Sequence, residues 1–316
     1  MNFLVIGHLC YDEIHVDGRD PVTGFGGIYY AVASLAAFAG EEHKIIPVFG
    51  VGKDREEELH SCLAAFPNIQ TDGIFTLDNP TNTVKLIYGN TEERIECSEH
   101  IAPPIPMRAV EPFVKRSDAV LVNMVSGFDI TFDVLYMINE QKRSRNVPVY
   151  FDFHSMTLGI DENNKRFKRP MVDWRRWAFQ TNIVQMNELE AGTLTVERLS
   201  EIQLAKIMMS LGPTAMIITR GKQGVHLYYA DKKKILEKEI SGIPLPGKEN
   251  KMPGVPDIDP TGCGDVYGAA CIFHYARSGD IVASAQFANR VAARKAMLQG
   301  SDDLQQLSDA TINEDE

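Results

Sequence analysis

The sequence lacks the features that mark secreted, membrane and nucleic-acid-binding proteins. Its five cysteines include no Cys-x-x-Cys pair, so we expect neither a disulfide framework nor a thiolate zinc site. No apolar run approaches the roughly 18 residues that a bilayer span needs, and the first seven residues lack the basic start of a signal peptide. Acidic residues outnumber basic ones by 43 to 32, and a net charge of −11 repels nucleic acids and anionic lipids. We therefore expect a soluble cytoplasmic protein with no nucleic acid or membrane partner.

Several motifs of nucleotide-binding and hydrolytic enzymes are also missing. A P-loop requires G-x-x-x-x-G-K-[ST], but Gly221-Lys222 is followed by Gln223, and Met216 stands where the first glycine should be. The first apolar run ends in Gly7-His-Leu-Cys and not in the G-x-G-x-x-G of dinucleotide-binding folds. HExxH, G-x-S-x-G and Cys/His clusters do not occur, which argues against the hydrolases and metalloenzymes that use them.

Short apolar runs alternate with segments of helical periodicity along most of the chain. This alternation predicts an α/β fold with a mostly parallel sheet that is covered by helices on both faces. The expected strands are 3–7, 44–48, 119–123, 147–152, 183–186 and 215–219. The expected helices are 27–39, 55–66, 131–142, 196–211 and 280–298.

Residues 12–16, 83–88 and 94–97 alternate apolar and polar side chains, as half-exposed strands do. They predict a small sheet that projects from the core. A cover over a reactive site, an edge hairpin and a dimer contact all fit this pattern. The polar, acidic residues 301–316 predict a frayed tail.

The most informative segment runs from Asp259 through Pro-Thr-Gly-Cys-Gly to Asp265, directly before an apolar helix. Gly262 and Gly264 would let backbone N–H groups approach an anion at the positive end of the helix dipole. Asp265 at the same helix start could accept the proton of an attacking hydroxyl. Such an arrangement suits phosphoryl transfer, although a helix cap after a glycine turn would look the same in isolation.

This segment resembles the D-T-x-G-A-G-D signature of the ribokinase family, the PfkB-type carbohydrate kinases. Three other segments resemble family elements and occur in the family's order. Asn187-Glu-Leu-Glu190 is similar to N-x-x-E, Thr219-Arg-Gly-Lys-Gln-Gly224 to T-x-G-x-x-G, and Gly26-Gly27 to the substrate-side glycine pair. Each has a plain structural alternative, namely a helix cap, a hairpin and a helix entry.

The resemblance implies a three-layer αβα sandwich with a mostly parallel sheet and a small β lid. The kinase core would span residues 1–300, and the lid about 10–24 and 80–104. The implied reaction is ATP-dependent phosphotransfer to an alcohol group of a sugar or sugar-like polyol, with Mg²⁺. K⁺ is left open, because Pro260 replaces the common second threonine beside Asp259.

The resemblance also assigns roles to individual residues. The implied catalytic residues are Asp265 as base with Gly262, Cys263 and Gly264 as the anion hole. The implied nucleotide-binding residues are Asn187, Glu190, Thr219, Gly221, Gly224, Thr261 and Asn289, with an exposed helical asparagine as the alternative for the last. The implied metal ligands are Glu190 and Asp259, and the implied substrate residues are Asp12, Gly26 and Gly27.

The substrate end departs from the family pattern. Ala31 stands where the family has a sugar-binding asparagine, and we expect the neighbouring Tyr29 and Tyr30 to belong to the core. Asn123 ends a strand, at the sheet edge where ligands bind in α/β folds, and is a further substrate candidate. The segment Asp152-Phe-His154 lacks the family's asparagine and arginine. We expect the basic run 165–169, with Arg175 and Arg176, to be a solvated loop.

These departures leave the acceptor unidentified. A nucleoside kinase of the same family, or a catalytically silent sugar or nucleotide sensor, is the alternative to a sugar kinase. A homodimer formed through the lid strands is also compatible with the sequence.

Overall fold

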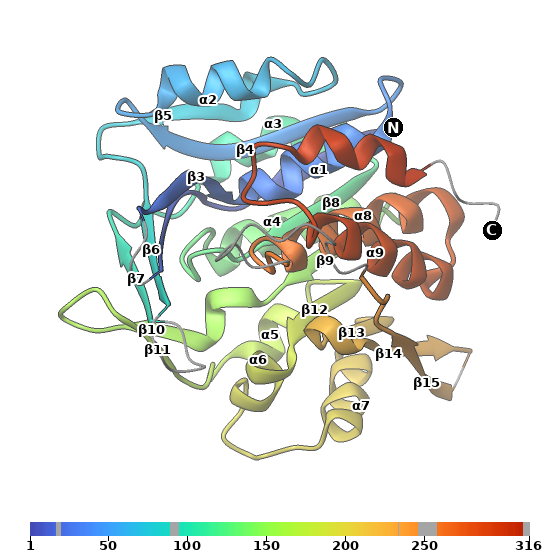
Figure 1. Cartoon of the computed structure of the whole chain (residues 1–316). Helices are drawn as coiled ribbons and strands as arrows, with labels where there is room; N and C mark the ends of the chain where they lie inside the picture. The colour runs from blue at the N-terminus through green and yellow to red at the C-terminus, as the bar shows by residue number, and fades with distance from the viewer. Residues whose placement is uncertain (17–19, 89–94, 233, 246–257, 312–316) are drawn as a thin grey trace.

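The computed structural model describes residues 1–16, 20–88, 95–232, 234–245 and 258–311 (Figure 1). Parts of three expected features lie outside this range: residues 17–19 and 89–94 of the lid, residues 233 and 246–257 of the kinase core, and the end of the acidic tail at 312–316. Within the described residues all five cysteines are free, and no helix is both long and apolar enough to cross a bilayer.

The main sheet has nine strands in the order β15-β14-β13-β12-β9-β8-β1-β4-β5. Seven neighbouring strands, from β13 to β5, are parallel, and β14 and β15 add an antiparallel hairpin at one edge. The strands are β1 (Asn2–Ile6), β4 (Lys44–Gly52), β5 (Ile74–Leu77), β8 (Ala119–Asn123), β9 (Val149–Asp152), β12 (Ile183–Asn187), β13 (Ala215–Thr219), β14 (Gly224–Asp231) and β15 (Lys234–Ser241).

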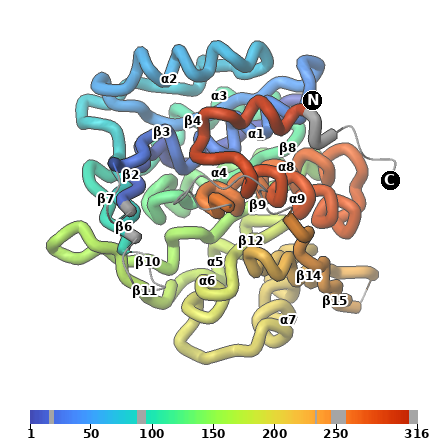
Figure 2. The backbone as a smooth tube through the Cα atoms, in the orientation of Figure 1, coloured from blue at the N-terminus to red at the C-terminus, as the bar shows by residue number. Residues whose placement is uncertain are grey.

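Helices cover both faces of this sheet (Figures 1 and 2). Successive residues of β1 show why: Phe3 and Val5 belong to one core cluster, whereas Leu4 and Ile6 belong to the other. The first face carries α1 (Ile28–Ala39), α2 (Glu56–Leu63), α8 (Cys263–Ser278) and α9 (Ile281–Lys295). The second carries α3 (Met107–Val114), α4 (Phe132–Arg143), α5 (Trp174–Ala178), α6 (Glu188–Thr193) and α7 (Glu201–Leu211). The predicted three-layer αβα sandwich is confirmed.

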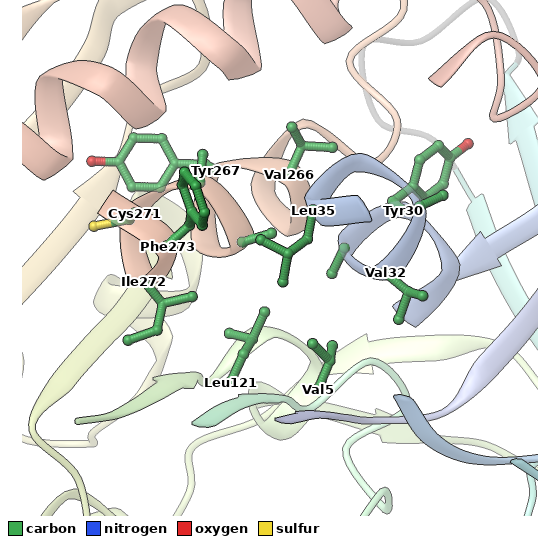
Figure 3. Packing of buried hydrophobic residues seen from close by; sticks show 14 of the residues in the cluster. Val5, Tyr30, Val32, Leu35, Leu121, Val266, Tyr267, Cys271, Ile272 and Phe273 are labelled. Atoms are coloured by element: carbon green, nitrogen blue, oxygen red, sulfur yellow. The ribbon is translucent and has the colours of Figure 1, made fainter. Parts of the chain in front are cut away.

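The packing of α1 and α8 fixes the position of the phosphate motif. In Figure 3, Leu35 of α1 and Val266 of α8 lie close together above Val5 of β1 and Leu121 of β8. On the sheet side of α8, a Cβ on Gly268 would lie 3.3 Å from the Tyr150 ring. The close approach of helix and sheet therefore holds the start of α8 near the ends of β8 and β9.

A separate four-stranded sheet has the order β3-β2-β6-β7. Its strands are β2 (Leu9–Val16), β3 (Val22–Gly27), β6 (Thr83–Tyr88) and β7 (Ile95–Glu99). The short hairpin of β10 (Leu158–Ile160) and β11 (Arg166–Lys168) contacts this sheet through a bridge between Cys97 and Lys165. The sequence did not predict this hairpin.

The frayed tail expected over 301–316 is wrong for its described part. Residues Leu304–Thr311 form a 3₁₀ helix, η4, which packs on α1. Leu304 and Leu307 are fully buried in the core, because side chains three residues apart lie on the same side of a 3₁₀ helix. The core therefore extends beyond the expected boundary at residue 300, and two leucines outweigh the polar composition of the segment.

One helix also begins later than expected. The predicted helix 196–211 starts at Glu201, since Ser200 and Gln203 form a capping box there. Val196 lies outside the helix and is largely exposed.

Candidate active site

Four parallel strands that are neighbours in the sheet end in polar residues. Asn123 of β8 pairs in register with Asp152 of β9, and Asn187 of β12 pairs with Thr219 of β13. The carboxyl ends of neighbouring parallel strands meet at one edge, which is where ligands bind in open α/β sheets. The start of α8 lies at this same edge, because Asp265 of α8 accepts a hydrogen bond from Asn123 of β8.

Asp265 is buried at the start of α8 and is held by Asn123. The Asn123 Nδ2 amide donates to Asp265 Oδ1 at 2.5 Å. Burial raises the pKa of Asp265 above its usual range, whereas His154, Asn123 and Lys295 act in the opposite direction. Asn123 Oδ1 has no hydrogen-bond partner in the described part of the chain, so it is available to a ligand hydroxyl.

The glycine turn before Asp265 is shaped by close contact with α1. Gly262 has a left-handed φ of 75°, and a Cβ there would lie 2.3 Å from Cγ of Tyr30. The Cys263 amide is already used, since it donates to the Pro260 carbonyl at 3.2 Å. Within the described chain, the Gly264 amide makes no backbone hydrogen bond, so it is a donor that an anion could meet at the helix N-terminus.

Gln185 links the helix start to the sheet, and the sequence analysis did not identify it. Its Nε2 donates to Asp152 Oδ2 at 2.8 Å and to the Gly264 carbonyl at 3.0 Å, while its Oε1 accepts from Tyr150 at 2.6 Å. Gln185 lies inside an apolar strand, and a buried polar residue there is the one signal that could have indicated its role.

His154 stands among the carboxylates at this edge. It begins the 3₁₀ helix η2 (His154–Thr157) with a left-handed φ of 33°, and its amide donates to Asp152 Oδ1 at 3.2 Å. Burial lowers the pKa of the imidazole, but Asp265, Glu190 and Asp152 raise it by more, so that the pKa lies above its usual value. Burial likewise raises the pKa values of Asp152 and Glu190. His154 and these carboxyl groups therefore influence one another's ionisation.

Asn187 and Glu190 form the capping box of α6. Asn187 Oδ1 accepts from the Glu190 amide at 2.9 Å, and the Glu190 carboxylate accepts from the Asn187 amide and side chain, both at 2.7 Å. Within the described residues, no group of three or more His, Cys, Asp or Glu side chains could hold a metal ion. The two expected ligands, Glu190 and Asp259, belong to different hydrogen-bond networks.

Four of the expected nucleotide residues, Thr219, Gly221, Gly224 and Asn289, lie at or beside the edge hairpin. Gly221 and Gly224 both have left-handed φ values, 50° and 99°, in the turn that joins β13 to β14. Gly224 pairs with Ser241 of β15, and Asn289 of α9 donates to the Ser241 carbonyl at 2.9 Å. The structure therefore brings Gly224 and Asn289 together, and it places Thr219 at the end of the strand before them.

The expected substrate residues lie where the small sheet joins the core. Asp12 is buried on β2 opposite β3, and Gly26 makes room for it, since a Cβ on Gly26 would lie 2.0 Å from Asp12 Oδ2. Gly27 has a left-handed φ of 58° and enters α1. Tyr29 and Tyr30 are core residues, as predicted. Burial, followed by the charges of Asp12, Asp259 and Asp265, raises the pKa of Tyr30.

The solvated-loop prediction for residues 165–169 is wrong for Arg166. Its side chain is only 7% exposed and donates from one Nη to the Ser126 carbonyl at 2.7 Å. The other Nη and Nε have no partner within the described residues. The β10–β11 hairpin turns this one residue inward because strand side chains alternate between faces.

A monovalent cation at Asp259, which the sequence left open, would meet a buried lysine in this chain. Lys295, the last residue of α9, is fully buried, and its Nζ lies 3.4 Å from the Asp259 carbonyl and 3.5 Å from Asp259 Oδ2. The Leu298 carbonyl is also 3.4 Å from this Nζ. A second monovalent cation about 4 Å from the ammonium would be repelled by about 4 kcal/mol at an effective dielectric constant of about 20. Lys295 therefore already supplies a positive charge beside Asp259.

Comparisons with known proteins find similar kinases. Residues 161–305 match the model of the pfkB family carbohydrate kinases. A cytidine kinase of Thermococcus kodakarensis is 26% identical over 292 residues, which cover 88% of this chain and 89% of that protein. A ribokinase of Bacillus subtilis is 23% identical over 308 residues, which cover 92% of both chains.

Solved structures show the same fold. A pyrophosphate-dependent kinase of the ribokinase family, in a sulfate complex, gives a TM-score of 0.74 at 18% identity over 97% of this chain and 99% of that one. A ribokinase of Arabidopsis thaliana complexed with ribose and ATP gives 0.69 at 16% identity over 97% and 98%.

Proposed function

Because the chain carries a PfkB family carbohydrate kinase domain, we propose that it transfers a phosphoryl group from ATP to an alcohol group of a sugar or sugar-like polyol. The observation that carries this proposal is the buried Asp265 at the start of α8, held by Asn123 at 2.5 Å. A positioned carboxylate beside the Gly264 amide at a helix N-terminus suits a reaction in which a hydroxyl attacks a phosphoryl group.

Asp265 acts as the general base. Its raised pKa makes it a better proton acceptor than an ordinary aspartate, while the bond from Asn123 and the nearby His154 oppose part of that rise. The proton of the acceptor hydroxyl passes to Asp265 as the oxygen attacks the phosphorus. The Gly264 amide at the positive end of α8 faces the negative charge of the transferred group. No covalent enzyme intermediate is required.

Asp152, Glu190 and His154 form the polar floor of the donor site. Magnesium prefers oxygen ligands and keeps several waters, so Asn187 and Glu190 would hold it through its hydration shell, without a dedicated cluster of ligands. Bound Mg²⁺ would neutralise and orient the donor phosphates. Gln185 holds Asp152 and the Gly264 carbonyl together, so it fixes this floor relative to the helix start.

The two ends of the site hold the two substrates. Thr219, Gly221, Gly224 and Asn289 would bind the nucleotide beside the β13–β14 turn, where Asn289 and Gly224 meet at Ser241. Asp12, with Gly26, would accept hydrogen bonds from acceptor hydroxyls. The sheet of β2, β3, β6 and β7, within residues 10–24 and 80–104, would cover the acceptor and exclude water.

A nucleoside kinase is the second candidate. The relative that favours it is the cytidine kinase, at 26% identity over 292 residues. The same experiment compares ATP with pyrophosphate as the phosphoryl donor, since one structural neighbour is a pyrophosphate-dependent kinase.

The test is product release over a panel of acceptors. Purified protein with Mg²⁺ and either ATP or pyrophosphate is offered pentoses, hexoses, inositols and nucleosides, and the phosphorylated product is measured. We expect one acceptor class to turn over with ATP, and Asp265→Asn to lower kcat by about 10² to 10⁴-fold. Asp78→Asn, a change at a fully exposed aspartate, should leave the rate unchanged.

Two results would contradict the proposal. Turnover that survives in Asp265→Asn would remove Asp265 as the base. Binding of sugars or nucleosides, detected by a rise in melting temperature, without product release in the wild type would indicate a sensor.

A further inference from the structure

Lys295 connects the end of α9 to the turn that precedes Asp265. Its buried ammonium lies between the Asp259 carbonyl, Asp259 Oδ2 and the Leu298 carbonyl, at 3.4 to 3.5 Å from each. The Asp259 carboxylate in turn accepts from the Thr261 amide at 2.9 Å and from the Gly300 amide at 2.8 Å. Lys295 and Asp259 thus join three chain segments: the end of α9, the turn at Asp259 and the residues from Leu298 to Gly300.

The same ammonium reaches the glycine turn through an aromatic ring. Lys295 Nζ lies 5.2 Å from the centroid of the Tyr30 ring, within the range of a cation–π contact. Tyr30 fills the space that a side chain at Gly262 would occupy. Lys295 therefore packs against Tyr30, and Tyr30 packs against Gly262. A shift of Lys295 would be transmitted through this ring to the residues that face the phosphoryl group.

The oxygen atoms around Lys295 are those that a monovalent cation would use. Two backbone carbonyls and one carboxylate are oxygen donors of the kind that bind alkali cations, but here a side chain of the protein supplies the charge. The ammonium is permanently tethered, so its occupancy does not depend on the salt in solution. Burial also protects it from screening.

We infer that Lys295 is a built-in monovalent cation that holds residues 259–262 in place, and that phosphotransfer by this protein does not depend on added K⁺. Lys295 is a positioning residue, because it acts on the reacting groups through Asp259 and Tyr30. The inference rests on the proposed kinase function for its activity readout, and on thermal unfolding for a readout that needs no activity.

The first test compares cations in the wild-type protein. Turnover and melting temperature are measured in KCl, NaCl and tetramethylammonium chloride at equal ionic strength. We expect rates that agree within about twofold and no melting shift specific to K⁺, since a site already filled cannot gain from a second cation. Activation or stabilisation by K⁺ over tetramethylammonium would overturn the inference.

The second test removes the charge. In tetramethylammonium, Lys295→Met should lower turnover by at least about tenfold, because a small displacement near the reacting groups is costly. KCl or NH₄Cl should restore part of the rate and raise the melting temperature of the variant by about 2 °C or more. If activity is lost and neither K⁺ nor NH₄⁺ specifically restores it, Lys295 contributes packing and not a cation, and the inference is overturned.

A matched control is available in Lys142. This lysine is equally buried, and its Nζ donates to the Ser117 carbonyl at 2.5 Å, but it lies on α4 in the other helical layer. Lys142→Met should lose stability without any cation-dependent turnover. If Lys295→Met does not fold, the wild-type comparison decides alone. If the wild type phosphorylates no acceptor, the proposed function fails, while the melting data still test Lys295.

Discussion

The amide of Asn123 donates to the carboxylate of Asp265 at 2.5 Å, although 142 positions separate the two residues in the chain. Asn123 ends a strand, and Asp265 begins a helix that packs over that strand. Nδ2 of Asn123, and not its Oδ1, faces the carboxylate, because the opposite orientation would place two acceptor oxygens together. The pair therefore fixes both the position of the base and the direction of the free Asn123 Oδ1.

Loss of the Asn123 amide should weaken the base. Asn123→Ala removes one charge-assisted hydrogen bond worth about 1.5 to 3 kcal/mol, so we expect kcat/KM to fall by about 10 to 100-fold. Asn139→Ala is the control, since Asn139 lies on α4, away from the sheet edge, and its Nδ2 donates to Gln180 Oε1. Equal losses in the two variants would indicate a general effect on folding.

The pH dependence of the reaction should report the environment of Asp265. The base must be ionised, so kcat/KM falls as the pH drops through its pKa. Burial raises this pKa, and the falling limb should lie at a higher pH than for an exposed aspartate. His154→Gln removes a positive charge that lowers the pKa of Asp265 and should move the limb to still higher pH. His60→Gln, on the exposed face of α2, should not move it. A shift of this limb to lower pH in His154→Gln would contradict the prediction.

Asp265→Asn should stabilise the protein while it removes activity. A carboxyl group whose pKa is raised by folding contributes stability below its unfolded pKa and loses that contribution as the pH rises through the folded pKa. At neutral pH the buried charge therefore costs stability, and an amide avoids that cost. We expect a melting temperature about 2 °C or more above wild type at pH 8, with a difference that shrinks towards acid pH. A constant difference at all pH values would point to another cause.

The two ends of α8 offer a paired glycine experiment. Gly262 and Gly279 both have left-handed φ values, 75° and 69°, but only Gly262 is close to another side chain, Tyr30. Gly279→Ala should cost about 1 kcal/mol of stability and leave turnover unchanged. Gly262→Ala should cost more and lower kcat by at least about tenfold, because the clash displaces the residues beside Asp265. Denaturant unfolding and kinetics separate the two effects.

The small sheet exposes a group of apolar side chains. Val22, Ile87 and Ile95 are 58%, 38% and 42% exposed, and Ile87 pairs with Ile95 across β6 and β7. We expect this surface to form a homodimer, and Ile95→Lys to convert dimers to monomers in light scattering. Val172→Lys, at a 94% exposed position outside the sheet, is the control. A wild-type monomer at micromolar concentration would remove the dimer expectation.

Much of the architecture follows from local patterns. The apolar runs predicted the buried parallel strands, because such strands are covered on both faces and need no polar alternation. The glycine-flanked start of α8 was visible for a similar reason, since a left-handed turn before an apolar helix has few other residue choices. Residues 304–311 were misjudged, because two leucines among polar neighbours carry little periodic signal until α1 provides the surface that buries them.

The sequence by itself determined six of the core parallel strands, the turn at Gly262 and the presence of Asp265 at a helix start, since these depend on residues close together in the chain. Only the tertiary structure decided which distant side chains contact the segment that leads to Asp265. Asn123, Gln185 and Lys295 reach the Asp259–Asp265 segment across separations of 142, 79 and 36 positions. Their partners are fixed by the packing of α8 and α9 on the sheet, and a buried charge at Lys295 is tolerated only because that packing surrounds it with oxygen atoms.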